Sequence, residues 1–255
     1  MELNAKRISL RTFLIYSAVN ILTYLFAHVA YLFESDALGE FFEYLSYYIS
    51  KSVEFLAPPI IATVALLVFI NCGKGALLKF TLTVSSARVF YSLPYYYIIF
   101  IYNHGYDSAE SILLSLLASV LIILVTALGV FASLGIYYLV VKKQCANSGT
   151  SIGDFLPSLL TRTEAVDFLS PLNVPVLTFA LTRFTFSLLT EIADTVAFFI
   201  EYRSDFIAKE IITILANFIL LFLLLIVSYL VAAGIKNALI KKKDDISHLI
   251  EYKPE

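Results

Sequence analysis

The amino-acid sequence predicts an all-α polytopic membrane protein, a bundle of six transmembrane helices that forms a single membrane domain over residues 1–255. Of the 255 residues, 60% are apolar and 15% are charged, against about 45–50% and about 25% in soluble domains. The mean hydropathy is +0.85, and a globular core of this size cannot bury such an apolar excess. This composition excludes a secreted enzyme and a disordered chain. The net charge of −2 excludes the basic surface of a nucleic-acid binder.

Six apolar segments reach the length of about 20 residues that crosses a hydrocarbon core. The predicted spans are 12–33, 55–72, 80–102, 111–141, 174–200 and 211–235. The first continues past the length of a signal peptide and lacks a clear small-residue cleavage site, so it is expected to stay as a helix. The fourth exceeds what a bilayer requires, and we expect it to tilt or to extend into water at its inner end.

The positions of Lys and Arg predict the orientation of these spans. With a cytoplasmic N-terminus, the inner segments hold most of the basic residues, and the outer segments hold Lys51, Arg203 and Lys209. This asymmetry places both termini in the cytoplasm. The compact chain with short loops further favours a multi-pass protein of a prokaryotic plasma membrane.

Two connections carry amphipathic patterns. The first outer loop, up to residue 54, is expected to lie in the headgroup plane or to extend the second span until Pro58 and Pro59 kink it. The inner loop 142–173 holds a flexible Ser- and Gly-rich turn, then a short amphipathic helix over 154–169. That helix either links two halves of the bundle at the membrane surface or docks a partner chain. The lysines at 241–243 are expected to contact anionic lipid headgroups.

Weak internal similarity suggests three repeated helical hairpins. Gly73, Gly135 and Gly234 each open a mostly apolar run that ends in lysine, close to the inner end of an even-numbered span. Residues 88–93 (RVFYSL) and 183–188 (RFTFSL) match in the third and fifth spans. Three parallel hairpins would pack around an axis along the membrane normal.

Polar side chains concentrate on one face of each odd-numbered span, so we expect these spans to face one another and the even-numbered spans to face lipid. The candidate substrate-binding residues are Asn20, Tyr24 and His28 of the first span, Arg88, Ser92 and Tyr95 of the third, and Arg183, Ser187, Glu191 and Asp194 of the fifth. A charge at mid-bilayer costs at least about 2.5–3.5 kcal/mol. We therefore expect Arg88 to pair with Glu191 or Asp194. The charges either line a polar cavity for a solute or ion, or form an ion pair that fixes helix register.

The sequence contains no recognisable catalytic motif, metal-ligand cluster or phosphate-binding loop, and no cofactor is expected. The favoured interpretation is a small transporter, or the membrane-embedded, substrate-binding subunit of one. In it Arg88 and Arg183 hold a negatively charged or polar solute, and Glu191 and Asp194 carry coupling or gating charge. The alternative is a non-transporting scaffold, sensor or assembly factor that acts through 154–169. An enzyme acting on lipid is a third option. The expected partners are the lipid bilayer and a cytoplasmic or membrane chain, and not nucleic acid.

Overall fold

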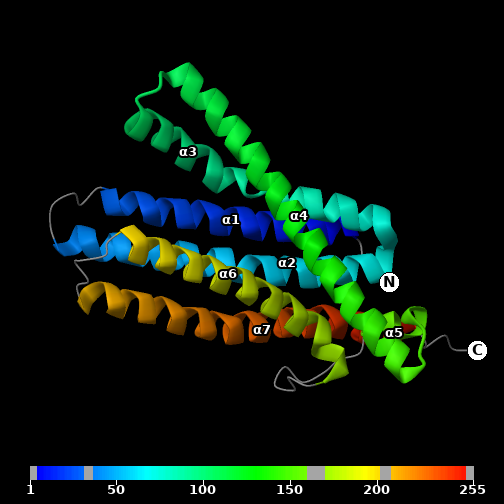
Figure 1. Cartoon of the computed structure of the whole chain (residues 1–255). Helices are drawn as coiled ribbons and strands as arrows, with labels where there is room; N and C mark the ends of the chain where they lie inside the picture. The colour runs from blue at the N-terminus through cyan, green and yellow to red at the C-terminus, as the bar shows by residue number, and fades with distance from the viewer. Residues whose placement is uncertain (1–4, 32–36, 160–169, 202–207, 251–255) are drawn as a thin grey trace, which may run out of the picture. The chain divides into compact units, whose positions relative to one another are not determined.

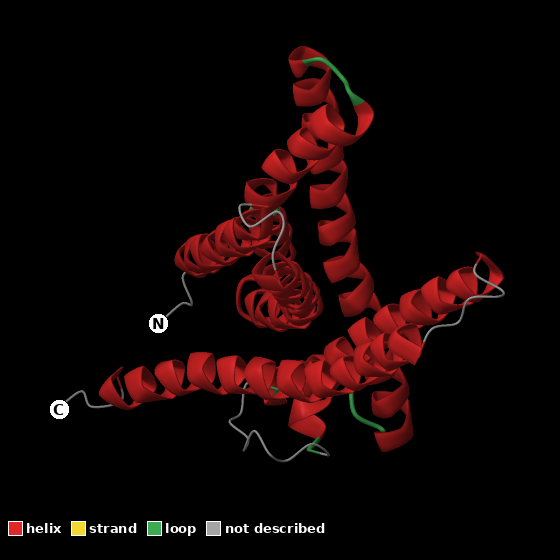
Figure 2. Cartoon of the chain, turned by 90° about the vertical axis from the view of Figure 1, so that its left-hand side faces the viewer, coloured by secondary structure: helices red, strands yellow, loops and turns green. Residues whose placement is uncertain are grey.

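The computed structural model describes residues 5–31, 37–159, 170–201 and 208–250 (Figure 1). Within them, the side chains of 27–31, 37–40, 43, 102–104, 199, 201, 208–210 and 241–250 are not described. The described chain is helical, with short connecting loops and no strand (Figure 2). The predicted all-α class is therefore confirmed.

The helices follow one another with few intervening residues. They are α1 (Ala5–Tyr31), α2 (Ala37–Ser86), α3 (Val89–His104), α4 (Ser108–Ser148), α5 (Ile152–Ser158), the 3₁₀ turn η1 (Pro171–Asn173), α6 (Val174–Glu201) and α7 (Ala208–Ile250). The described residues contain five elements long and apolar enough to cross a membrane: Ala5–Phe26, Tyr44–Ile101, Ser108–Ser148, Pro171–Phe198 and Ile211–Ile240. The chain is an integral membrane protein.

The second of these elements contains two of the predicted spans. Tyr44–Ile101 is 58 residues long, far more than the about 20 that one crossing needs. Gly73 interrupts the helical conformation with φ 81° and ψ −175°. The cyan ribbon of α2 turns and runs back along its own direction (Figure 1). The bend lies in the connection predicted between spans 55–72 and 80–102.

Replacing Gly73 with alanine should destabilise the protein. A positive φ with an extended ψ is essentially confined to glycine, and other residues there cost about 1–3 kcal/mol. The added methyl group would meet no atom within 4 Å, so the whole cost is backbone strain. Gly75→Ala is the matched control, because Gly75 is helical and alanine favours a helix. The unfolding midpoint of the purified protein measures both. Equal midpoints for the two variants would contradict this account of the bend.

One expectation about the second span was wrong. The even-numbered spans were expected to face lipid, yet Ile61–Val68 is a continuous buried run. The backbone keeps a helical conformation through Pro58 and Pro59, because a membrane helix tolerates proline where side chains and local adjustments satisfy the freed carbonyls; the kink predicted there stays a prediction. The segment predicted as the first outer loop is therefore helical from Ala37 and continuous with the second span.

The fourth, fifth and sixth predicted spans each lie in one helix. The fourth lies in α4, which has 41 residues and continues to Ser148. The sixth lies in α7, which continues to Ile250. The fifth matches α6 within one residue. In the inner loop α5 starts at Ile152, where Ser151 caps it by accepting a hydrogen bond of 3.1 Å from the Asp154 amide. The rest of the predicted 154–169 helix, from 160, lies outside the described residues.

The three glycines of the suggested repeat do not share a conformation. Gly73 has a positive φ, whereas Gly135 and Gly234 lie inside the continuous helices α4 and α7. The lysine-rich ends of these segments therefore resemble one another in sequence and not in backbone geometry.

The chain divides into two compact units. Unit 1 comprises residues 1–57 and 64–132, and unit 2 comprises 58–63 and 133–255. In unit 1, α1 packs against α3, and the rings of Phe13 and Phe90 meet edge to face at 6.2 Å. In unit 2, α6 packs along α7. Val176 and Ala180 of α6 meet Tyr229, Ala232 and Ala233 of α7 in its buried core.

Candidate functional site

The third predicted span contains a short 3₁₀ turn at its arginine. Ala87 and Arg88 form a turn between the end of α2 and the start of α3. The amides of Ala87 and Arg88 donate to the carbonyls of Val84 and Ser85, both at 3.1 Å. These i−3 bonds are the tight 3₁₀ pattern, which often marks a hinge within a helix. Arg88 therefore projects from a junction between two helical segments.

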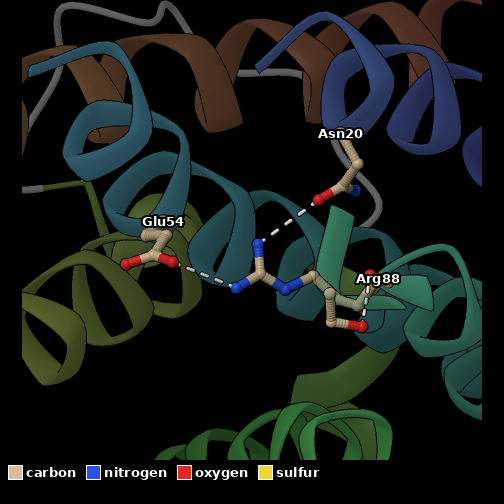
Figure 3. A network of polar contacts seen from close by, with 4 residues as sticks. Asn20, Glu54 and Arg88 are labelled. Atoms are coloured by element: carbon tan, nitrogen blue, oxygen red, sulfur yellow. Dashed lines mark hydrogen bonds and ion pairs between the residues drawn. The ribbon is translucent and has the colours of Figure 1, made fainter. Parts of the chain in front are cut away.

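The Arg88 guanidinium lies between two side chains from different helices (Figure 3). Its Nη1 donates to the Asn20 Oδ1 of α1 at 3.3 Å. Its Nη2 forms an ion pair with the Glu54 Oε1 of α2 at 3.1 Å. All three residues belong to unit 1. The pair neutralises a charge that is costly within an apolar span.

The three polar side chains differ in exposure. Asn20 is 1% exposed, and its Nδ2 donates to the Tyr16 carbonyl at 2.7 Å. The side chains of Arg88 and Glu54 are 14% and 44% exposed. The buried phenol of Tyr16 lies close enough to interact electrostatically with both charges. The cluster is therefore anchored on α1 and open on the side of Glu54.

Aromatic rings continue from the arginine along α3. The Arg88 guanidinium lies 5.6 Å from the centre of the Tyr91 ring, within the range of a cation–π interaction. Tyr91 stacks on Tyr95 at 5.3 Å with an angle of 18° between the rings. Tyr95 is 37% exposed. The guanidinium therefore lies beside two stacked aromatic rings, of which Tyr95 is partly exposed.

Ser92 joins helices next to this cluster. Its hydroxyl donates to the Arg88 carbonyl at 3.0 Å and lies 3.0 Å from the hydroxyl of Ser119 on α4. Ser92 and Ser119 are both buried. Ser92 therefore supports the turn at Arg88 by packing α3 against α4.

The structure brings together part of the predicted site. Asn20 and Arg88 are in contact, Ser92 and Tyr95 adjoin them, and the partly buried Tyr24 lies one turn beyond Asn20 on α1. His28 is in α1, but its side chain is outside the described part. The ion partner of Arg88 was predicted as Glu191 or Asp194 and is instead Glu54. Glu54 immediately precedes the second span, and this position is the signal that could have identified it.

The predicted residues of the fifth span lie in unit 2. Arg183, Ser187 and Glu191 are partly buried on α6, and Asp194 is exposed. Their spacing of four, four and three residues places them along one helix face. Whether they bind a solute stays a prediction.

A second buried polar contact was missed from the sequence. Lys236 of α7 is 2% exposed, and its ammonium donates to the Leu172 carbonyl and, at 3.1 Å, to the Asn173 Oδ1. From the sequence, this lysine was expected to be one more charge at the inner face. Its hydrogen bonds join η1 to α7 inside unit 2. A hydropathy profile does not reveal such a contact.

These contacts can hold an anion but offer no clear catalytic chemistry. A guanidinium is a permanent cation with several fixed donors, and the residues around it supply amide, hydroxyl and aromatic groups. Among the described residues, no three His, Cys, Asp or Glu side chains gather as a metal site requires. The chain matches no family model, no curated protein and no solved structure.

Proposed function

We propose that this membrane protein binds a polar solute at Arg88 and moves it across the membrane, alone or as the membrane-embedded subunit of a larger transporter. The observation that carries the proposal is the partly exposed ion pair between Arg88 and Glu54 inside apolar helices. Ionisable residues within membrane spans are costly and usually mark substrate or ion pathways.

The setting of the pair favours a functional over a register-fixing role. A pair that only fixes helix register would be expected to be closed, with both partners buried and well satisfied. Here the Glu54 side chain is 44% exposed, and its carboxylate meets the guanidinium through one oxygen. Such a pair holds the charge while leaving room for another ligand.

The turn at Ala87 and Arg88 supports the same proposal. A short 3₁₀ stretch within a helix often marks a functional hinge. In this chain that turn, the intramembrane cation and the stacked tyrosines coincide. The proposal depends on this unit 1 cluster alone and not on the charges of α6.

Uptake by lipid vesicles tests the proposed function. Vesicles containing the purified protein, or the complex recovered with it by pull-down in mild detergent, should take up at least one polar solute faster than protein-free vesicles. A mass-spectrometric survey of a metabolite mixture measures this without prior choice of solute. Equal rates for every solute, with no transport chain in the pull-down, would contradict transport.

We further propose that both termini face the cytoplasm of a prokaryotic plasma membrane. Cys72 is exposed and Cys145 is buried, and Cys72 lies at the predicted inner end of the second span. A membrane-impermeant maleimide should therefore label inside-out vesicles and not right-side-out ones, and Cys72→Ser should remove the label. Labelling of right-side-out vesicles at Cys72 would reverse the assigned orientation.

A further inference from the structure

The contact between Arg88 and Glu54 is a single-point pair. One nitrogen, Nη2, meets one oxygen, Oε1, at 3.1 Å. A guanidinium presents a planar fork of donors that matches both oxygens of a carboxylate. The Glu54 carboxylate uses one arm of that fork, while the other arm, Nη1, contacts the neutral amide of Asn20 at 3.3 Å. A carboxylate with freedom to align would bind this guanidinium better than Glu54 does.

The arginine is held in place without Glu54. Asn20 is 1% exposed and is itself fixed by its bond to the Tyr16 carbonyl. On another side lies the ring of Tyr91, and the turn that carries Arg88 is braced by Ser92. Glu54, by contrast, is exposed over 44% of its side chain. Of the two charged groups, the carboxylate is the one free to leave.

We propose that Glu54 is an internal ligand of Arg88 that the carboxylate of a bound solute replaces. This inference rests on the proposed function and names its substrate class. Exchange of one carboxylate for another keeps the guanidinium neutralised throughout, so no unpaired charge is left within the membrane. Glu54 stands at the start of a predicted span and moves toward the aqueous side when it is released.

The surroundings of the guanidinium specify the rest of the solute. Tyr91 and Tyr95 form a stacked pair beside it, and Tyr95 is partly open. Aromatic rings favour flat apolar partners in offset-stacked or edge-to-face contact. The substrate class is therefore a small monocarboxylate with an apolar or aromatic body, and benzoate is the simplest probe of it.

Calorimetric titration of benzoate into the full chain in lipid nanodiscs tests the exchange. Glu54→Gln removes the competing charge, so it should bind benzoate at least about tenfold more tightly than the wild type. Glu110→Gln is the matched control, because Glu110 is exposed at the start of α4 and changes the net charge equally; its affinity should equal that of the wild type. The double variant Glu54→Gln/Arg88→Gln should bind no benzoate, and benzamide, the uncharged analogue, should bind none of the proteins.

Equal benzoate affinity in the wild type and Glu54→Gln, weaker binding by Glu54→Gln, or no binding by either would overturn the exchange. Thermal unfolding of the same samples shows that each variant is folded. The proposed function fails by a different result, the absence of faster uptake of any solute in the vesicle survey. Unchanged benzoate affinity together with Arg88-dependent uptake of another solute would remove the exchange and leave transport standing.

Discussion

Replacing Arg88 with leucine should abolish solute uptake while the chain still inserts into the membrane. Each hydrogen bond to a charged group contributes about 1.5–3 kcal/mol, and a solute bound to both arms of the guanidinium would lose two of them. That loss corresponds to at least about a hundredfold in affinity. Insertion should survive, because leucine removes a charge from an apolar span and the partner Glu54 is already 44% exposed.

Two further variants separate the possible roles of this arginine. Arg88→Lys keeps the charge and loses the planar fork, so it should retain weak uptake. Arg183→Leu tests the separate prediction from the sequence that α6 also binds the solute, on which the proposed function does not depend. Loss of uptake with insertion intact would support that prediction. If Arg88→Leu and Arg183→Leu both disappear from the membrane, the arginines have a structural role. Wild-type uptake by Arg88→Leu would exclude this residue from the binding site.

Replacing Lys236 with methionine should destabilise the protein by about 1–3 kcal/mol. Lys236 is 2% exposed and donates to the Leu172 carbonyl and to Asn173. Methionine has similar length and no donor, so it would remove a hydrogen bond from a buried acceptor, which costs about this much. The midpoint of unfolding by heat or by sodium dodecyl sulfate measures the change.

The matched control for Lys236 is Lys142→Met. Lys142 belongs to the same unit and is exposed on α4, so its replacement changes the charge equally without breaking a buried contact. Its unfolding midpoint should stay close to that of the wild type. Equal midpoints for the two variants would show that the contacts of Lys236 add nothing to stability.

The spans were largely predictable because a membrane helix is an apolar segment of known minimum length. The same reasoning located the connection at Gly73, where two glycines and two lysines separate two apolar segments. Pro58 and Pro59 do not break the helix, because proline is tolerated where neighbouring groups satisfy the freed carbonyls. The reasoning failed for the burial of Ile61–Val68, since an apolar run reads the same whether it faces lipid or protein.

The candidate site was only partly predictable. Helical spacing grouped Asn20 with Tyr24 and His28. It also grouped Arg88 with Ser92 and Tyr95, because residues on one face of a helix can be identified from the sequence. The partner of Arg88 could not be read in this way. Glu54 lies 34 residues away, and the contact depends on how α2 turns at Gly73 and approaches α3. Lys236 was missed for the same reason, since its acceptors lie 63 and 64 residues away.

The most direct test of the central claim is to identify the small molecules that the protein retains. Wild type and Arg88→Leu, purified in parallel from native membranes in mild detergent, would be denatured and their released solutes compared by mass spectrometry. The account predicts a carboxylate-containing solute that is enriched with the wild type and absent from Arg88→Leu. Identical solutes from the two proteins, or none from the wild type, would contradict a solute site at Arg88.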